Sequence, residues 1–320
     1  MTPSETDIIQ NTLSIAPAVD GLYVLITVYP ESNALNASGQ VLHHALNEEA
    51  LTRCLLNTAS PLAALWSSPS AAVWAIGADG TVWTTAAVDW PPPSGVRFDV
   101  VDPSLKWKVT RLPNLSKERY APNLAAIWGT SDRNVFCATT SGVIYRWDGS
   151  RWSESPSGFQ SSLSGLHGTG PDDVYCVGYN GSVSHYDGQA WQPVPVTGIE
   201  SASTIITGVC AVAPNKAYLV TNRGELLAGD RRGFRPLAKA QAKFMGIAGL
   251  PGRLFLCSSP GGAWELIGIR IVQVKGNFAA TDVQEAAGRL YFIETEQPLG
   301  PSAVEFSPDR QDSPWERIVF

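Results

Sequence analysis

The sequence has little of what helical or metal-binding proteins need. Of its 320 residues, two are Met and four are His, and charged residues make up 16%, against about 25% in ordinary soluble domains. Long runs of Ala, Glu, Lys and Leu are missing, which argues against a helical protein. Gly (29) and Pro (23) are frequent, as expected where turns join many short strands.

Cysteine is also scarce, and its pattern argues against a disulfide framework. The number of cysteines, five, is odd, no C-x-x-C pair occurs, and most lie in apolar runs such as residues 135–138 and 174–177. Free Cys commonly behaves as a small buried hydrophobe, so the pattern favours a reducing compartment. The first ten residues lack the basic and apolar regions of a secretory signal, and no apolar run has the length of a membrane span. The sequence therefore predicts a cytoplasmic protein without a membrane segment.

The charge balance argues against one class of partner. The formal net charge is −6 and the pI is about 5.3. A net negative charge disfavours attraction to phosphate backbones. We expect no nucleic-acid partner.

The sequence repeats itself. Residues 124–152 and 163–191 align without a gap, and residues 62–83 form a third clear copy. Four weaker copies bring the total to seven, and they include residues 19–27, 206–227, 244–266 and 283–294. A repeat of this kind at a period near 40 residues indicates an array of small supersecondary units.

Each copy has the same internal order of signals. An apolar run leads into a polar turn, and an alternating strand follows. Next come a turn with Gly, such as Asn180-Gly181, and a third strand that ends at an Asp-Gly turn, such as Asp148-Gly149. These turns are typical of β-hairpins. The fourth strand opens with an aromatic residue in five copies: Trp107, Trp152, Trp191, Phe234 and Trp315.

Four short antiparallel strands per repeat are typical of a propeller blade. One such blade cannot bury both of its faces alone, but a closed ring of blades covers every face. We predict an all-β, single-domain β-propeller over residues 1–320 with seven four-stranded blades, and six blades as the alternative. The ring is expected to close by packing of the first blade against the last, without exchange of a strand. The approximate blades are 9–60, 61–121, 122–160, 161–200, 201–241, 242–278 and 279–320.

The pattern W-G-[TS]…V-[YF]…[WY]-D-G-x-x-W resembles the divergent WD40-like and kelch-like propeller repeats common in bacterial proteins. Its best copies are residues 124–152 and 163–191, and the Trp147-Asp148 dipeptide lies where WD40 repeats carry theirs. The resemblance implies the fold and leaves the function open.

The sequence shows no constellation for catalysis or metal binding. His43 and His44 are adjacent and would point to opposite faces of a strand. His167 is predicted at a packing position and His185 at an outward strand position. No nucleophile elbow, phosphate loop or dinucleotide fingerprint occurs. We therefore predict a protein that is not an enzyme and that uses no metal or cofactor. The recurring aspartates are expected to form turns with their own backbone: Asp148, Asp187 and Asp230.

Six residues are candidates for an interface. Trp90 precedes a triple proline in an insertion that one blade has, although it could equally pack that insertion onto its own blade. Exposed aromatic residues and arginines in loops commonly anchor protein interfaces. The other candidates lie in expected connections and turns: Tyr120, Phe159, Tyr179, Asn180 and Arg223.

These observations favour a monomeric, non-enzymatic scaffold that binds another protein. An immunity, inhibitor or adaptor protein for a bacterial toxin or secreted effector would fit this description. A lectin-like propeller is the first alternative, but lectins repeat their sites, and the corresponding loop residues here differ between blades (Asp79, Thr140, Asn180 and Arg223). A lyase or glycosidase with a site on the propeller axis is the second alternative.

Overall fold

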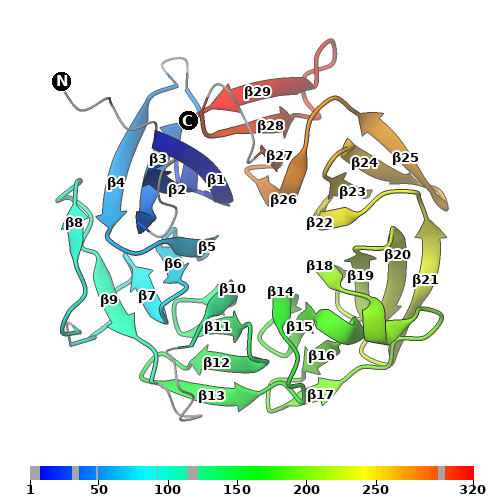
Figure 1. Cartoon of the computed structure of the whole chain (residues 1–320), viewed down its shortest axis with the longest axis horizontal. Helices are drawn as coiled ribbons and strands as arrows, with labels where there is room; N and C mark the ends of the chain where they lie inside the picture. Colours follow the sequence, from blue (N-terminus) through cyan, green and yellow to red (C-terminus); the bar gives the residue numbers. More distant parts are fainter. Residues whose placement is uncertain (1–7, 31–35, 48–49, 92, 114–121, 295–299) are drawn as a thin grey trace.

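The computed structural model describes residues 8–30, 36–47, 50–91, 93–113, 122–294 and 300–320. Seven antiparallel sheets stand around a central axis in the order of the chain (Figure 1). This confirms the predicted all-β propeller with seven blades, and the alternative of six blades is wrong. Two single-turn 3₁₀ helices, η2 (Tyr179–Gly181) and η3 (Ser201–Ser203), are the helical elements assigned bounds in the described part of the chain.

Each blade has four antiparallel strands in chain order, from the axis outward, and the first blade gains a fifth. Blade 1 contains β1 (Ile8–Pro17), β2 (Gly21–Pro30), β3 (Ser38–Ala45) and β4 (Thr52–Thr58). Blade 2 contains β5 (Leu62–Ser67), β6 (Val73–Gly77), β7 (Thr81–Thr84) and β9 (Lys108–Arg111). Blade 3 contains β10 (Leu124–Ser131), β11 (Asn134–Thr139), β12 (Val143–Trp147) and β13 (Trp152–Pro156). Blade 4 contains β14 (Leu163–Gly170), β15 (Asp173–Gly178), β16 (Val183–Tyr186) and β17 (Trp191–Pro193).

The last three blades follow the same plan. Blade 5 contains β18 (Ile206–Ala213), β19 (Lys216–Thr221), β20 (Glu225–Asp230) and β21 (Gly233–Lys239). Blade 6 contains β22 (Phe244–Leu250), β23 (Arg253–Ser258), β24 (Gly262–Ile267) and β25 (Arg270–Lys275). Blade 7 contains β26 (Ala280–Ala286), β27 (Arg289–Glu294), β28 (Ser302–Phe306) and β29 (Trp315–Val319).

The core lies between neighbouring blades. The second strand of a blade is covered on both faces, so every residue of β6 and β11 is buried, whereas the outermost strands β25 and β29 are largely exposed. A strand with two covered faces needs apolar residues at successive positions rather than at alternate ones. Runs such as Val135-Phe136-Cys137-Ala138 satisfy this need.

The ring geometry explains the Trp-Gly pair of the repeat. A Cβ added to Gly129 would lie 2.9 Å from the Trp66 ring of the preceding blade, and one added to Gly168 would lie 2.9 Å from the Trp128 ring. The ring of each Trp therefore covers the Gly of the next blade, where a larger residue would clash. The Trp-Gly motif occurs within one repeat, but the contact behind it joins the ring of one blade to the Gly of the next blade.

The ring closes without a shared strand, as predicted. The Gln284 side chain of β26 accepts a hydrogen bond from the backbone N–H of Ile15 in β1 (2.5 Å) and contacts Ser14 Oγ. At the outer side, the Phe320 ring packs edge-on against His44, with centroids 5.3 Å apart. Side-chain bonds and packing thus join blade 7 to blade 1.

The insertion of blade 2 connects two blades. Residues 98–100 form β8 (Phe98–Val100), which pairs with β4 and becomes the fifth strand of blade 1. Trp90 is 8% exposed, and its ring centroid lies 5.7 Å from Trp74 of its own blade and 5.4 Å from Trp147 of blade 3. Of the two roles expected for Trp90, the buried ring rules out an exposed anchor and fits packing, although the ring packs blade 2 against blade 3 and not only against its own blade.

The propeller has two faces, which we name by their turns. The upper face carries the turns between second and third strands and the connections between blades, for example residues 140–142, 157–162, 179–182, 194–205 and 222–224. The lower face carries the turns between first and second strands and between third and fourth strands, for example residues 68–72, 148–151, 214–215, 251–252 and 268–269.

Candidate functional site

The main cavity is the axial channel, with a volume of about 1370 Å³, lined by the innermost strands of all seven blades. Its shape is uneven. In blades 2, 3 and 4 the lining residues come from the innermost strand alone, whereas in blades 5 and 6 the lining extends to the second and third strands on the lower face. The cavity is therefore a channel with a lateral extension between blades 5 and 6.

At one position of the innermost strand, the residue type differs between the two sides of the channel's opening on the lower face. Blades 2, 3 and 4 place Trp66, Trp128 and His167 there, and the Trp128 and His167 rings lie 5.9 Å apart. Blades 5 and 6 place Cys210 and Ala248 at the same position. Large rings thus bridge consecutive blades on one side of the mouth, and small side chains leave the other side open.

His167 is held neutral. Its Nδ1 accepts a hydrogen bond from the backbone N–H of Ala211 in blade 5 (3.2 Å), which an unprotonated nitrogen can do. Burial lowers the pKa of His167 to about 4. The predicted packing role of His167 is confirmed, and the ring also forms a bond between blades.

The second strand of each blade carries an aromatic residue that faces the next blade. In blades 2, 3, 4, 6 and 7 this residue is fully buried: Trp74, Phe136, Tyr175, Phe255 and Tyr291. Where the next blade supplies an aromatic partner from its third or fourth strand, the rings pack closely. Phe136 meets Tyr186 at 5.1 Å, Tyr175 meets Phe234 at 5.8 Å, and Phe255 meets Phe306 at 5.1 Å.

Blade 5 breaks this rule at Tyr218, which is partly exposed and lines the cavity. The positions in blade 6 that should supply its aromatic partner hold Leu266 and Ile271, which correspond to Phe306 and Trp315 of blade 7. Both aliphatic side chains are only partly buried in this interface. We call the resulting opening the Tyr218 recess; it is lined by Val212, Lys216, Tyr218, Leu254 and Leu266.

The rim of the Tyr218 recess is apolar and cationic. Ile267 and Ile269, which flank Gly268 in the adjoining turn, are 53% and 73% exposed. The ammonium group of Lys216 lies 5.9 Å from the centre of the Tyr218 ring. Among the described residues, Lys216 forms no ion pair with a carboxylate, whereas Arg253 is paired with Glu265 at 2.7 Å. The rim can therefore attract a carboxylate from outside.

The channel also contains one unusual carboxylate. Asp282 of β26 accepts hydrogen bonds from the backbone N–H of Val283 (2.8 Å) and from the amide of Gln284 (3.0 Å). Burial raises the pKa of Asp282 to about 6, although these bonds act in the opposite direction. No group of three or more His, Cys, Asp or Glu side chains that could hold a metal ion occurs in the described part of the chain.

His185 is not an outward residue, and this corrects the sequence-based expectation. It is 3% exposed, and its Nε2 lies 2.8 Å from an oxygen of Asp173. The corresponding positions hold Arg146 with Asn134 and Arg253 with Glu265. The pair is thus one copy of a recurring cross-strand bond, and such a bond supports packing beside the buried aromatic residue.

The recurring aspartates form turns as expected. Asp148 Oδ1 accepts hydrogen bonds from the side chain and backbone of Ser150 and from the Arg151 N–H, and these bonds lower the pKa of Asp148 to about 2. Asp187 and Asp230 make the same type of backbone contact.

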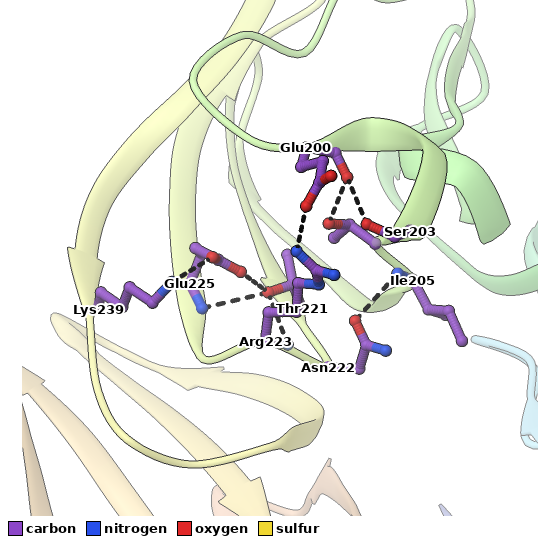
Figure 2. A network of polar contacts seen from close by, with 9 residues as sticks. Glu200, Ser203, Ile205, Thr221, Asn222, Arg223, Glu225 and Lys239 are labelled. Carbon is purple, nitrogen blue, oxygen red and sulfur yellow. Dashed lines mark hydrogen bonds and ion pairs between the residues drawn. The ribbon is translucent and has the colours of Figure 1, made fainter.

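The remaining interface candidates lie on the upper face. Tyr179 is 45% exposed, and Asn180 has a φ of 58° in the turn that η2 forms. Arg223 is paired with Glu200 at 2.7 Å, and Figure 2 shows how this pair joins the turn after β19 to the loop that contains η3. Phe159 is half-buried. Tyr120 lies outside the described residues.

The sequence reasoning missed the Tyr218 recess. The available signal was an omission: the fourth strand opens with an aromatic residue in blades 2, 3, 4, 5 and 7, but blade 1 has Thr52 and blade 6 has Ile271 at that place. The omission alone does not locate the recess, because Tyr291 of blade 7 is fully buried although blade 1 also lacks the aromatic residue.

Comparison with known proteins supports the fold alone. No protein-family model matches the sequence, and no curated protein matches it. The structure is similar to virginiamycin B lyase from Staphylococcus aureus, with a TM-score of 0.62 at 11% identity over 90% of this chain and 96% of the other. It is also similar to the WD40 β-propeller domain of Doa1, with a TM-score of 0.63 at 10% identity over 91% and 93% of the two chains. The WD40 repeats of RRP9 give a TM-score of 0.62 at 10% identity over 94% of each chain.

These similarities establish a β-propeller with WD40-like neighbours. Likeness at such low identity carries no substrate, partner or reaction to this chain. No helix in the described part of the chain is long and apolar enough to cross a membrane.

Proposed function

We propose that this protein is a non-enzymatic scaffold that binds another protein through the lower face of the ring. The observation that carries the proposal is the distribution of exposed apolar side chains. Large apolar residues that protrude in or beside the lower-face turns are Val19, Leu51, Val212, Ile267 and Ile269, and they include the two most exposed large apolar side chains of the described residues, Val19 (85%) and Ile269 (73%). Those that protrude near the upper ends of strands or in upper-face turns are Ile8, Tyr179, Met245 and Val319. Apolar groups gathered on one surface are a common mark of a protein interface.

The rigidity of the ring supports the same proposal. The exposed residues lie in short turns or at the ends of strands that the ring holds in place, so little conformational entropy is lost when they dock. Binding would then depend on shape and charge complementarity, and no reaction step is required of the chain.

The more specific form of this proposal is that the partner is a bacterial toxin or secreted effector, which the propeller would inhibit or deliver. It is supported by the differences between blades, since a partner that touches several unlike turns can be recognised specifically. Co-expression tests it: the chain should suppress the toxicity of a captured partner, and undiminished toxicity would sink this form.

An affinity pulldown with the full chain from a lysate of the source organism tests the general proposal. We expect one stoichiometric protein partner, retained by Tyr179→Ala and lost with the double variant Val19→Asp/Ile269→Asp. Both positions are exposed turns, so both variants should fold. An empty pulldown, or a partner that both variants retain equally, would contradict binding through the lower face.

A further inference from the structure

The Tyr218 recess has the surroundings of a site that receives an aromatic ring. In three other interfaces, the ring that corresponds to Tyr218 is covered by an aromatic side chain of the next blade, at centroid distances of 5.1–5.8 Å. Leu266 and Ile271 replace that side chain in blade 6. Three aromatic pairs between blades thus show how an aromatic side chain from outside the chain would pack on Tyr218.

The charge at the recess further limits which kind of protein segment would bind there. Lys216 stands over one side of the Tyr218 ring. Arg270 pairs with Ile267 across β24 and β25, next to the Leu266–Ile271 pair that faces Tyr218, so Arg270 lies on the opposite face of blade 6 from the recess. The recess therefore presents one cation, Lys216, that pairs with no carboxylate among the described residues, on a chain with a net charge of −6. A carboxylate on the occupant would be attracted to this rim, and a basic occupant would be repelled.

We propose that the Tyr218 recess binds a segment of a partner protein in which an aromatic side chain lies beside a carboxylate. The aromatic ring would enter between blades 5 and 6 and pack on Tyr218, as Tyr186 packs on Phe136 within the chain. A carboxylate beside the ring would pair with Lys216. This inference rests on the proposed function and identifies which part of the lower face makes the contact.

The repeat supplies a test variant that closes the recess without disturbing the fold. Leu266→Phe/Ile271→Trp places at these positions the residues that blade 7 uses, Phe306 and Trp315. Lys216→Glu reverses the charge at an exposed site. Tyr179→Ala changes an exposed residue on the upper face, away from the proposed interface, and it serves as the control.

Short random peptides displayed on phage are selected on the full-length parent chain, and the strongest binder is synthesised. We expect enrichment of peptides with an aromatic residue beside Asp or Glu. The synthesised peptide should bind Leu266→Phe/Ile271→Trp and Lys216→Glu at least about tenfold more weakly, a loss of about 1.4 kcal/mol, and should bind Tyr179→Ala normally. A peptide with Lys in place of its acidic residues should also bind about tenfold more weakly.

Two results would overturn the proposal: no enriched aromatic and acidic peptide, or a peptide that binds the filled variant as tightly as the parent. The pulldown separates this failure from that of the proposed function. A partner that the filled variant still captures, and that Val19→Asp/Ile269→Asp loses, would leave the scaffold function standing and remove the recess as its site.

Discussion

The interface between blades 3 and 4 and the interface between blades 5 and 6 are built on the same repeat but differ in what fills them. In the first, Phe136 packs against Tyr186 and Trp191, and Trp128 stacks on His167. In the second, Tyr218 faces aliphatic residues, and the innermost strand carries Cys210 in place of a large ring. The comparison shows that a propeller can reserve a binding position simply by omitting side chains that its other blades use for packing.

The largest expected difference concerns the buried aromatic residue itself. Tyr175 is fully buried, so Tyr175→Ala should reduce the free energy of unfolding by about 3–5 kcal/mol, as for large-to-small changes in a packed core. Tyr218→Ala should reduce it by about 1–2 kcal/mol, because Tyr218 already contacts solvent. Urea denaturation measures both. Equal losses would mean that the recess is closed in solution.

A second pair of variants compares how tightly the innermost strands approach one another. A Cβ at Gly168 would collide with the Asp173 carbonyl oxygen and the Trp128 ring, whereas one at Gly249 would lie 3.4 Å from Cys210 Sγ, an ordinary contact. Gly168→Ala should therefore reduce the free energy of unfolding by about 2–3 kcal/mol, and Gly249→Ala should change it by less than about 0.5 kcal/mol. Chemical denaturation measures the free energy of unfolding of both variants. A larger loss with Gly249→Ala than with Gly168→Ala would contradict the tighter packing at Gly168.

The pH dependence of stability probes the bond between blades 4 and 5. Because the pKa of His167 is about 4 in the folded state and about 6.5 in the unfolded chain, unfolding takes up a proton between these values. The stability that His167 contributes is present above pH 6.5 and is lost as the pH falls toward 4, by about 2 kcal/mol. His167→Gln, which uses the residue that blade 7 has at this position, should lose less stability over this range.

Thermal denaturation of the parent chain and His167→Gln at pH 7 and pH 4.5 measures this difference. The comparison between the two chains is needed because Asp282, with a pKa raised to about 6, shifts stability in the opposite direction over the same range. Identical pH profiles would show that His167 is not held neutral between the blades.

The smallest expected effect is a gain in the free energy of unfolding. Leu266→Phe adds an aromatic ring beside Tyr218, as Phe306 does beside Phe255, and should raise the free energy of unfolding by about 0.5–1 kcal/mol. Leu65→Phe, at a buried position in the innermost strand of blade 2, is the matched control and should destabilise the chain by overpacking. A loss of stability with Leu266→Phe would mean that the recess has no room for a ring.

The fold could be predicted from the sequence because the pattern of one four-stranded blade recurs along the chain. Hairpin turns such as Asn180-Gly181 and the recurring Asp-Gly turns set the strands, and the period sets the blades. The lining of the channel was harder to foresee, because Trp66 and Trp128 act on the blade that follows their own. Trp90 illustrates the same difficulty: its contacts with Trp147 and Trp152 join residues far apart in the sequence. A pattern within one repeat does not show what the neighbouring repeat covers.

Hydrogen exchange of the full chain, alone and with its captured partner, tests the central claim most directly. The account predicts slower amide exchange in residues 212–218, 251–254 and 266–270 on binding, with little change in residues 179–182 and 222–224. Slower exchange confined to those upper-face turns would contradict binding at the Tyr218 recess.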